Sequence, residues 1–172
     1  MRIGKTYSRV ATYLPLEDAR AAGIYPPEKQ MPWSWGAYEM RYVRFPDEIK
    51  GFRPLWINAD FLKKGNIRNG KLHINGQKFS ILYIDVNYLD SEALSAVLNL
   101  ARKGLPVCLK QPPKEIGRNK TEEFEKNLSE LLALENVNQD LKHFKDLKPV
   151  VKGENIPDFW IRKANRDYYI FF

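Results

Sequence analysis

Residues 79–113 constrain the fold more than any other part of the sequence, because they predict a strand, a helix and a second strand in succession. Residues 79–84 form an almost uninterrupted apolar run, which is typical of a strand buried on both faces. A helix should follow, with Asp90 or Ser91 capping its start and Gly104 suited to its left-handed C-cap. Four apolar residues at helical spacing form its inward face: Leu94, Val97, Leu98 and Ala101.

Residues 105–109 predict the second strand, which ends before the pair Pro112-Pro113. Two strands joined by a helix form a crossover, and such crossovers are nearly always right-handed and connect parallel strands. A parallel sheet needs cover on both faces. The sequence therefore predicts an α/β fold of the flavodoxin-like or Rossmann-like type, with a mostly parallel sheet and helices on both of its faces.

Local patterns predict further elements on either side of this unit. Residues 8–14 and 53–61 predict strands, and Val137 and residues 149–151 are weaker strand candidates. Residues 121–134 predict an amphipathic helix with an acidic first turn. Its inward side chains should be Phe124, Leu128, Leu131 and Leu132.

Two hairpins should extend the parallel sheet. The pair Asn75-Gly76 fits the tight turn that right-twisted antiparallel strands prefer, and it separates residues 71–74 from residues 77–79. Residues 159–172 predict a second hairpin that turns at Asn165-Arg166. The predicted fold is thus a parallel α/β sheet with a β-hairpin extension.

Composition is that of one ordinary globular domain. The 172 residues are 44% hydrophobic and 28% charged, and we expect a single domain spanning residues 1–172. No apolar run approaches the roughly 18 residues that a membrane span needs, so we expect no membrane association. The single cysteine, Cys108, excludes an internal disulfide.

A formal net charge of +7 raises the possibility of nucleic-acid binding. The basic residues are scattered along the chain, however, and acidic residues are interleaved with them, as in residues 121–126. No stripe or motif organises the charge, so we favour a solvated basic surface and expect no nucleic-acid partner. A basic module that binds nucleic acid or protein stays open as the alternative.

The candidate site lies where the first predicted strand ends. Glu17 and Asp18 follow residues 8–14, at the carboxyl edge of the sheet, where ligands bind in such folds. Trp33, Trp35 and Tyr38 lie in or after a proline-rich loop that can fold beside them. Carboxylates and aromatic faces together complement a sugar ring, but the same residues could instead form an interface with another domain. Both interpretations stay open, and we favour the interface.

The chemistry of other common sites is missing from the sequence. No glycine-rich phosphate loop follows the first strand, so we expect no dinucleotide, no flavin and no other cofactor. Cys108 lies within the predicted strand of residues 105–109, where burial should leave its thiol inert. The two histidines, His73 and His143, have no metal-ligand spacing, so zinc is not expected. We therefore predict no catalytic residue.

Five blocks of sequence, in order, resemble a segment of family 106 glycoside hydrolases, the α-L-rhamnosidase-like enzymes of Bacteroidetes. The blocks are residues 13–41, 54–62, 82–94, 100–110 and 157–172. The resemblance implies the glutamine-amidotransferase-like α/β domain that follows the catalytic (β/α)8 barrel of those enzymes. Their catalytic carboxylates lie on the barrel, so the resemblance assigns none here. The amidotransferase nucleophile turn, Gly-x-Cys-x-Gly, is replaced by IDVNYLDSE at residues 84–92, so amidotransferase activity should be absent.

The resemblance also sets the expected function and context. We expect a non-catalytic accessory domain of a carbohydrate-degrading enzyme, with the catalytic barrel as its partner and one wall of a site for a rhamnose-containing saccharide as a further role. A periplasmic or secreted location would follow. The sequence stops within the predicted final strand, at Tyr168 to Phe172, without a polar tail, and this pattern predicts a segment of a longer protein.

Overall fold

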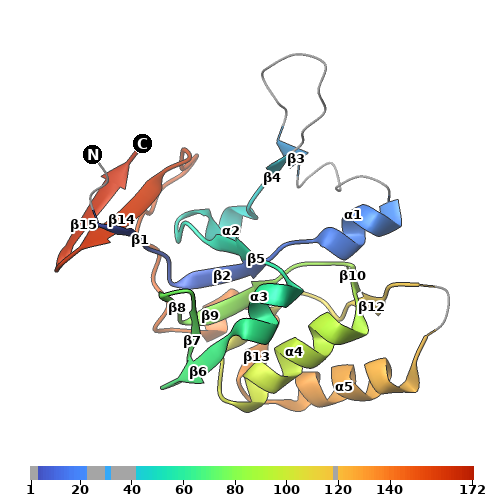
Figure 1. Ribbon diagram of the computed structural model, residues 1–172. Helices are drawn as coiled ribbons and strands as arrows, with labels where there is room; N and C mark the ends of the chain where they lie inside the picture. The colour runs from blue at the N-terminus through green and yellow to red at the C-terminus, as the bar shows by residue number, and fades with distance from the viewer. Residues whose placement is uncertain (1–3, 23–29, 32–41, 118–119) are drawn as a thin grey trace.

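A computed structural model describes residues 4–22, 30–31, 42–117 and 120–172, and it has an α/β fold (Figure 1). Its main sheet has five parallel strands in the order β13-β11-β9-β2-β5. The strands are β2 (Val10–Tyr13), β5 (Leu55–Ile57), β9 (Ile81–Ile84), β11 (Val107–Leu109) and β13 (Val137–Asn138). The predicted central unit is confirmed, because β9 and β11 are parallel neighbours and α4 (Ser91–Arg102) connects them.

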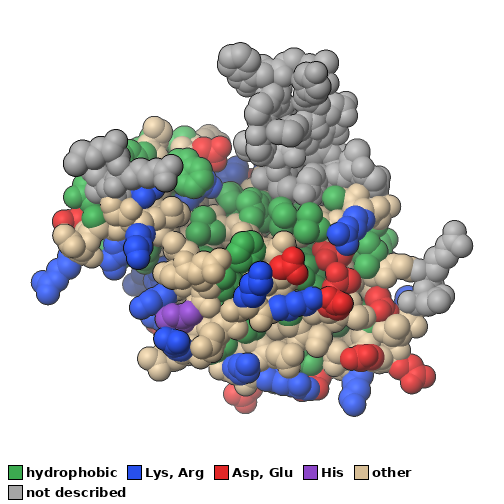
Figure 2. Space-filling model, viewed as in Figure 1, with side chains coloured by type: hydrophobic (Ala, Val, Ile, Leu, Met, Phe, Trp, Pro, Cys, Tyr) green, Lys and Arg blue, Asp and Glu red, His purple; other side chains and the backbone are tan. Residues whose placement is uncertain are grey.

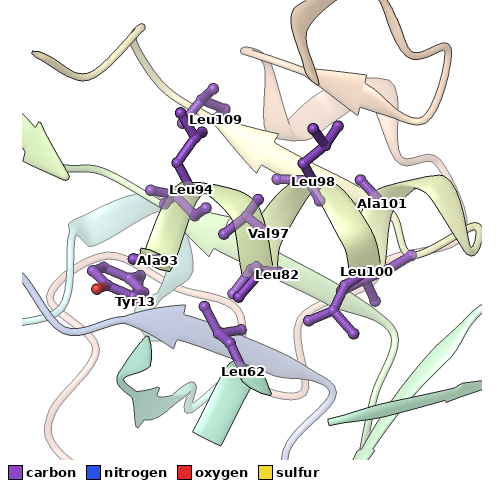
Figure 3. Packing of buried hydrophobic residues seen from close by; sticks show 14 of the residues in the cluster. Tyr13, Leu62, Leu82, Ala93, Leu94, Val97, Leu98, Leu100, Ala101 and Leu109 are labelled. Atoms are coloured by element: carbon purple, nitrogen blue, oxygen red, sulfur yellow. The ribbon is translucent and has the colours of Figure 1, made fainter. Parts of the chain in front are cut away.

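Three helices cover one face of the sheet: α3 (Ala59–Lys64), α4 and α5 (Glu122–Ala133). The predicted inward face of α4 is confirmed, since Leu94, Val97 and Leu98 are buried. Figure 3 shows these side chains gathered with Leu62 of α3 and Leu82 of β9. This first face therefore holds the larger hydrophobic core.

Capping side chains fix the starts of the two long helices. The Asp90 carboxylate accepts a hydrogen bond of 2.6 Å from the backbone N–H of Ala93 at the start of α4. The Thr121 hydroxyl accepts one of 3.2 Å from Phe124 at the start of α5. Each bond satisfies a backbone donor that the helix itself leaves unpaired. The helix starts predicted from these polar residues are thus confirmed.

The opposite face has a thinner cover. Only α2 (Asp47–Lys50), the 3-10 turn η2 (Leu141–His143) and irregular segments beside them lie over it among the described residues. Strand side chains alternate between the two faces, so Val10, Ile81, Tyr83 and Cys108 point to this side and pack on Ile49 and Phe52. Helical segments do lie on both faces, as predicted, but their sizes are unequal.

Two three-stranded antiparallel sheets accompany the main sheet. One contains β6 (Asn66–Arg68), β7 (Lys71–Ile74) and β8 (Gln77–Phe79), and the turn between β7 and β8 has positive φ at Asn75 and Gly76. The other, with order β1-β14-β15, joins β1 (Lys5–Thr6), β14 (Trp160–Ala164) and β15 (Asp167–Phe171) and stands to one side of the main sheet (Figure 1). Both predicted hairpins are confirmed.

Three local predictions were wrong. The strand predicted over residues 53–61 ends at Ile57, because Asn58 caps α3 by accepting a hydrogen bond of 3.1 Å from Phe61 N–H. Residues 149–151 form no strand; the N–H groups of Val150 and Val151 donate to the Gly51 carbonyl instead. Leu132 on α5 is exposed rather than buried.

Candidate binding site

The strand order creates a topological switch point at the carboxyl edge of the main sheet. After β2 the chain moves to β5 on one side, and after β9 it moves to β11 on the other, so the connections that leave β2 and β9 diverge. The helix α1 (Leu16–Ala22) follows β2, and β10 (Tyr88–Leu89) lies just beyond β9. This arrangement brings the predicted site residues Glu17 and Asp18 to the switch point.

Asp18 connects α1 with the segment that follows β9. Its carboxylate accepts hydrogen bonds from the backbone N–H of Tyr88 at 2.7 Å and of Asn87 at 3.0 Å. The side-chain amide of Asn87 donates to it as well, at 3.2 Å. Since Asp18 is only 3% exposed, these bonds occupy a buried carboxylate and hold the segment after β9 against α1. The geometry assigns Asp18 a positioning role.

Glu17 lies beside it with only one of its oxygens engaged. The Tyr13 hydroxyl donates a hydrogen bond of 2.8 Å to Oε1, while no described residue donates to the buried Oε2. Burial raises the pKa of the Glu17 carboxyl, and the nearby Asp90 carboxylate raises that pKa further. Burial also raises the pKa of Tyr13. The site thus favours a neutral carboxyl at Glu17.

The aromatic half of the predicted site, Trp33, Trp35 and Tyr38, lies outside the described residues. Whether it joins the two carboxylates therefore stays a prediction. Glu17 and Asp18 are both buried, so in this structure they offer little oxygen surface to a ligand in solvent.

A second cluster, which the sequence analysis missed, lies beside the edge strand β5. Arg53 has its guanidinium 4.0 Å from the ring centroid of Trp160 and 5.4 Å from that of Phe45. Phe45 in turn stacks on Trp56, with ring centroids 4.6 Å apart and planes 14° apart. We call the hollow that these four residues help to line, together with Arg44, Lys50 and Asp158, the Arg53 pocket.

No local sequence pattern marked this pocket. Arg53 and Trp56 lie far from Asp158 and Trp160 along the chain, and the two pairs meet only through tertiary packing. An arginine with a positive φ, as Arg53 has at 49°, is also uncommon, but a sequence does not display it.

An exposed aromatic surface adjoins the pocket on the β14–β15 hairpin. Tyr169 and Phe171 lie on the same face of the hairpin as Trp160, Tyr168 and Ile170 lie on the other face, and all four β15 residues are exposed on this edge strand. Trp160 of β14 is 55% exposed and belongs to both this surface and the Arg53 pocket. Exposed apolar side chains concentrated on one element are uncommon unless they serve a contact.

Cys108 is an unreactive group in this fold. It is fully buried in β11, and its thiol lies 3.7 Å from the carbonyl oxygen of Gln139. Burial raises the pKa of the thiol to about 12, which leaves almost no thiolate at neutral pH. Within the described ranges, no three His, Cys, Asp or Glu residues are grouped so that they could hold a metal ion.

The described helices are too short or too polar for a membrane span. On the face shown in Figure 2, Lys and Arg side chains are mixed with Asp and Glu side chains over the region of α4 and α5. Comparison with known proteins adds no relative: no family model, no curated protein and no solved structure matches the chain.

Proposed function

We propose that the chain is a non-catalytic accessory domain of a carbohydrate-degrading glycoside hydrolase of the α-L-rhamnosidase-like type. In this proposal the domain docks onto the catalytic barrel and contributes surface to carbohydrate binding. The observation that carries the proposal is the exposed aromatic surface of the β14–β15 hairpin, together with the Arg53 pocket beside it. Both lie away from the buried polar groups at the carboxyl edge of the sheet.

The strand order supports the finer fold assignment within this proposal. If the five parallel strands are numbered along the chain, their order is 2-1-3-4-5, which is the flavodoxin-like order. A flavodoxin-like or Rossmann-like sheet of this kind is compatible with a domain related to class I glutamine amidotransferases. Ser91 and Glu92 begin the helix after β9, where those enzymes place their nucleophile turn, and Cys108 is buried one strand later.

The state of the polar groups supports a non-catalytic role. Asp18 is committed to three donors of the segment after β9, and Glu17 is buried against Tyr13. A general acid or base must reach the proton that it transfers. Neither carboxylate offers that access, whereas the aromatic side chains on β15 are open to a partner.

The test uses two samples: this chain alone, and this chain mixed with a catalytic barrel of the resembled family. We expect no hydrolysis of an aryl α-L-rhamnoside by the chain alone and measurable binding to the barrel by calorimetry. Phe171→Ser should weaken that binding at least about ten-fold, since buried aromatics dominate interface energetics. Leu132→Ser, which changes an exposed leucine on α5, is the matched control and should leave binding unchanged. Hydrolysis by the chain alone, or equal effects of the two variants, would disprove the proposal.

A further inference from the structure

The Arg53 pocket combines positive charge with aromatic surface. Its volume is about 670 Å³, enough for a ligand of one to a few rings. Three cationic side chains, Arg44, Lys50 and Arg53, line it, while Asp158 is the one acidic residue among the described lining residues. The ion pair of Lys50 with Asp47 at 2.5 Å neutralises part of this charge. A net positive pocket remains.

Arg53 is the best-placed cation for holding an anion. No described residue accepts a hydrogen bond from its Nε, and this atom is buried. Arg53 as a whole is only partly buried, so a ligand in the pocket would meet the terminal nitrogens of its guanidinium rather than Nε. Burial also lowers the pKa of Arg53 below its ordinary value, and the Asp158 carboxylate opposes that shift. The guanidinium therefore gains from a negative group that enters the pocket.

The rings around Arg53 limit how the guanidinium can move. Trp160 lies 4.0 Å from it, and Phe45 lies 5.4 Å away, as in cation–π contacts. Phe45 is fixed in turn by its stack on Trp56. A planar guanidinium held in this way presents its donors in a set direction, which suits the two oxygens of a carboxylate.

The aromatic walls suit the rest of the ligand. Trp160 is 55% exposed, so the part of its ring surface that Arg53 does not cover can contact the C–H surface of a sugar. A simple inorganic anion would leave this surface uncovered, and a neutral sugar would not engage the positive charge of Arg53. A saccharide that carries a carboxylate can contact the guanidinium of Arg53 and the ring of Trp160 at the same time.

We propose that the Arg53 pocket binds an acidic saccharide, with the carboxylate of a hexuronate unit on Arg53 and the sugar ring against Trp160. This proposal rests on the proposed carbohydrate-binding function and specifies its ligand class. Arg44 and Lys50 then attract the anion electrostatically from the rim of the pocket.

The experiment titrates the whole chain with a hexuronate trisaccharide and with its carboxyl-reduced, neutral counterpart, while tryptophan fluorescence and calorimetry are followed. We expect the acidic trisaccharide to bind at least about ten-fold more tightly, with a salt dependence that the neutral one lacks. Arg53→Gln should abolish the preference for the acidic sugar. Arg68→Gln, which removes the same charge from the exposed hairpin strand β6, is the control and should keep it.

Each result decides between the proposals. Equal affinity for the two trisaccharides overturns the acidic-ligand proposal but leaves carbohydrate binding intact. Binding of neither sugar at tens of millimolar overturns this proposal and the carbohydrate part of the proposed function, while the docking test above remains independent. A preference that survives Arg53→Gln places the site elsewhere and also overturns the proposal. If Arg53→Gln unfolds the chain, Arg44→Gln and Trp160→Ala at the pocket surface must weaken acidic binding instead.

Discussion

The two faces of the parallel sheet are covered in different ways. On the first face, α4 places Leu94, Val97 and Leu98 into a continuous core shared with α3 and α5. On the second face, the four-residue α2 and the short turn η2 lie over a smaller cluster around Tyr83 and Cys108. The first face is almost wholly apolar, whereas polar groups reach into the second.

A polar chain on the second face illustrates the difference. The Tyr83 hydroxyl donates a hydrogen bond of 2.6 Å to Glu48, and Lys110 pairs with the same carboxylate at 2.9 Å. The Arg53 pocket opens on this side, next to the end of α2. The comparison teaches that long helices supply most of the buried apolar area, while short elements leave charged and aromatic groups accessible for binding.

The largest expected effect concerns the thiol on the second face. Burial raises the pKa of Cys108 from 9.0 to about 12, so the thiolate fraction at pH 8 should fall about a thousand-fold relative to the unfolded chain. Alkylation by iodoacetamide should slow by at least that factor, measured by mass spectrometry with and without urea. Labelling within about ten-fold of the unfolded rate, with native circular dichroism, would show that α2 and η2 open independently of the first face.

The first face should respond strongly to a lost side chain. Leu98→Ala removes a fully packed leucine from the middle of α4 and should destabilise the protein by about 2–5 kcal/mol, because it leaves a cavity. Equilibrium urea unfolding measures the change. Leu132→Ala on the exposed side of α5 is the control and should cost much less. A loss below about 1 kcal/mol for Leu98→Ala would mean that the first face is not the main core.

Most helices and strands of the first face could be predicted from the sequence for a physical reason. The helices α4 and α5 and the strands β9 and β11 carry apolar residues at a regular spacing, and a capping residue marks each helix start. Gly76 and its neighbour Asn75 encode the β7–β8 turn directly. Such signals involve residues close together along the chain, so they can be recognised in a single sequence.

Three other features could not be predicted in the same way: the start of α3 on the first face, the Arg53 pocket and the bonds of Asp18. The apolar run Leu55-Trp56-Ile57 conceals the start of α3, since only the cap at Asn58 marks that six-residue helix. The Arg53 pocket depends on Trp160, which lies far away along the chain and reaches Arg53 only through the β14–β15 hairpin. The bonds of Asp18 to residues 87–88 also join distant segments. Tertiary contacts of this kind leave no local pattern.

At the carboxyl edge of the main sheet, replacing Asp18 should lower the stability of the protein more than replacing an exposed aspartate. Asp18→Ala leaves the partly buried backbone N–H groups of Asn87 and Tyr88 without their acceptor and should destabilise the protein by about 1–3 kcal/mol. Thermal and urea unfolding measure this loss. Asp167→Ala, at an exposed position of β15, is the matched control and should have little effect. Equal losses in the two variants would refute the positioning role of Asp18.

The smallest effect, and the most specific, concerns the protonation of Glu17. Its pKa is raised in the folded protein, chiefly by burial, so folding favours the neutral carboxyl. The stabilisation is complete below the unfolded pKa, near the ordinary value of 4.5, and is lost as the pH rises through the raised folded pKa. Glutamine stays neutral at every pH and can still accept the hydrogen bond from Tyr13.

Glu17→Gln should therefore be more stable than the native protein at pH 7, because burial disfavours the ionised carboxylate and does not disfavour the neutral amide in the same way. At pH 4 the difference should vanish, because both side chains are then neutral. Urea unfolding at the two pH values measures it, and Glu154→Gln, at an exposed position, should show no such pH dependence. If Glu17→Gln is destabilising by the same amount at pH 4 and at pH 7, the amide fits the buried position less well than the carboxyl does. A loss confined to pH 7 would instead show that folding favours the ionised form of Glu17, and it would contradict the raised pKa.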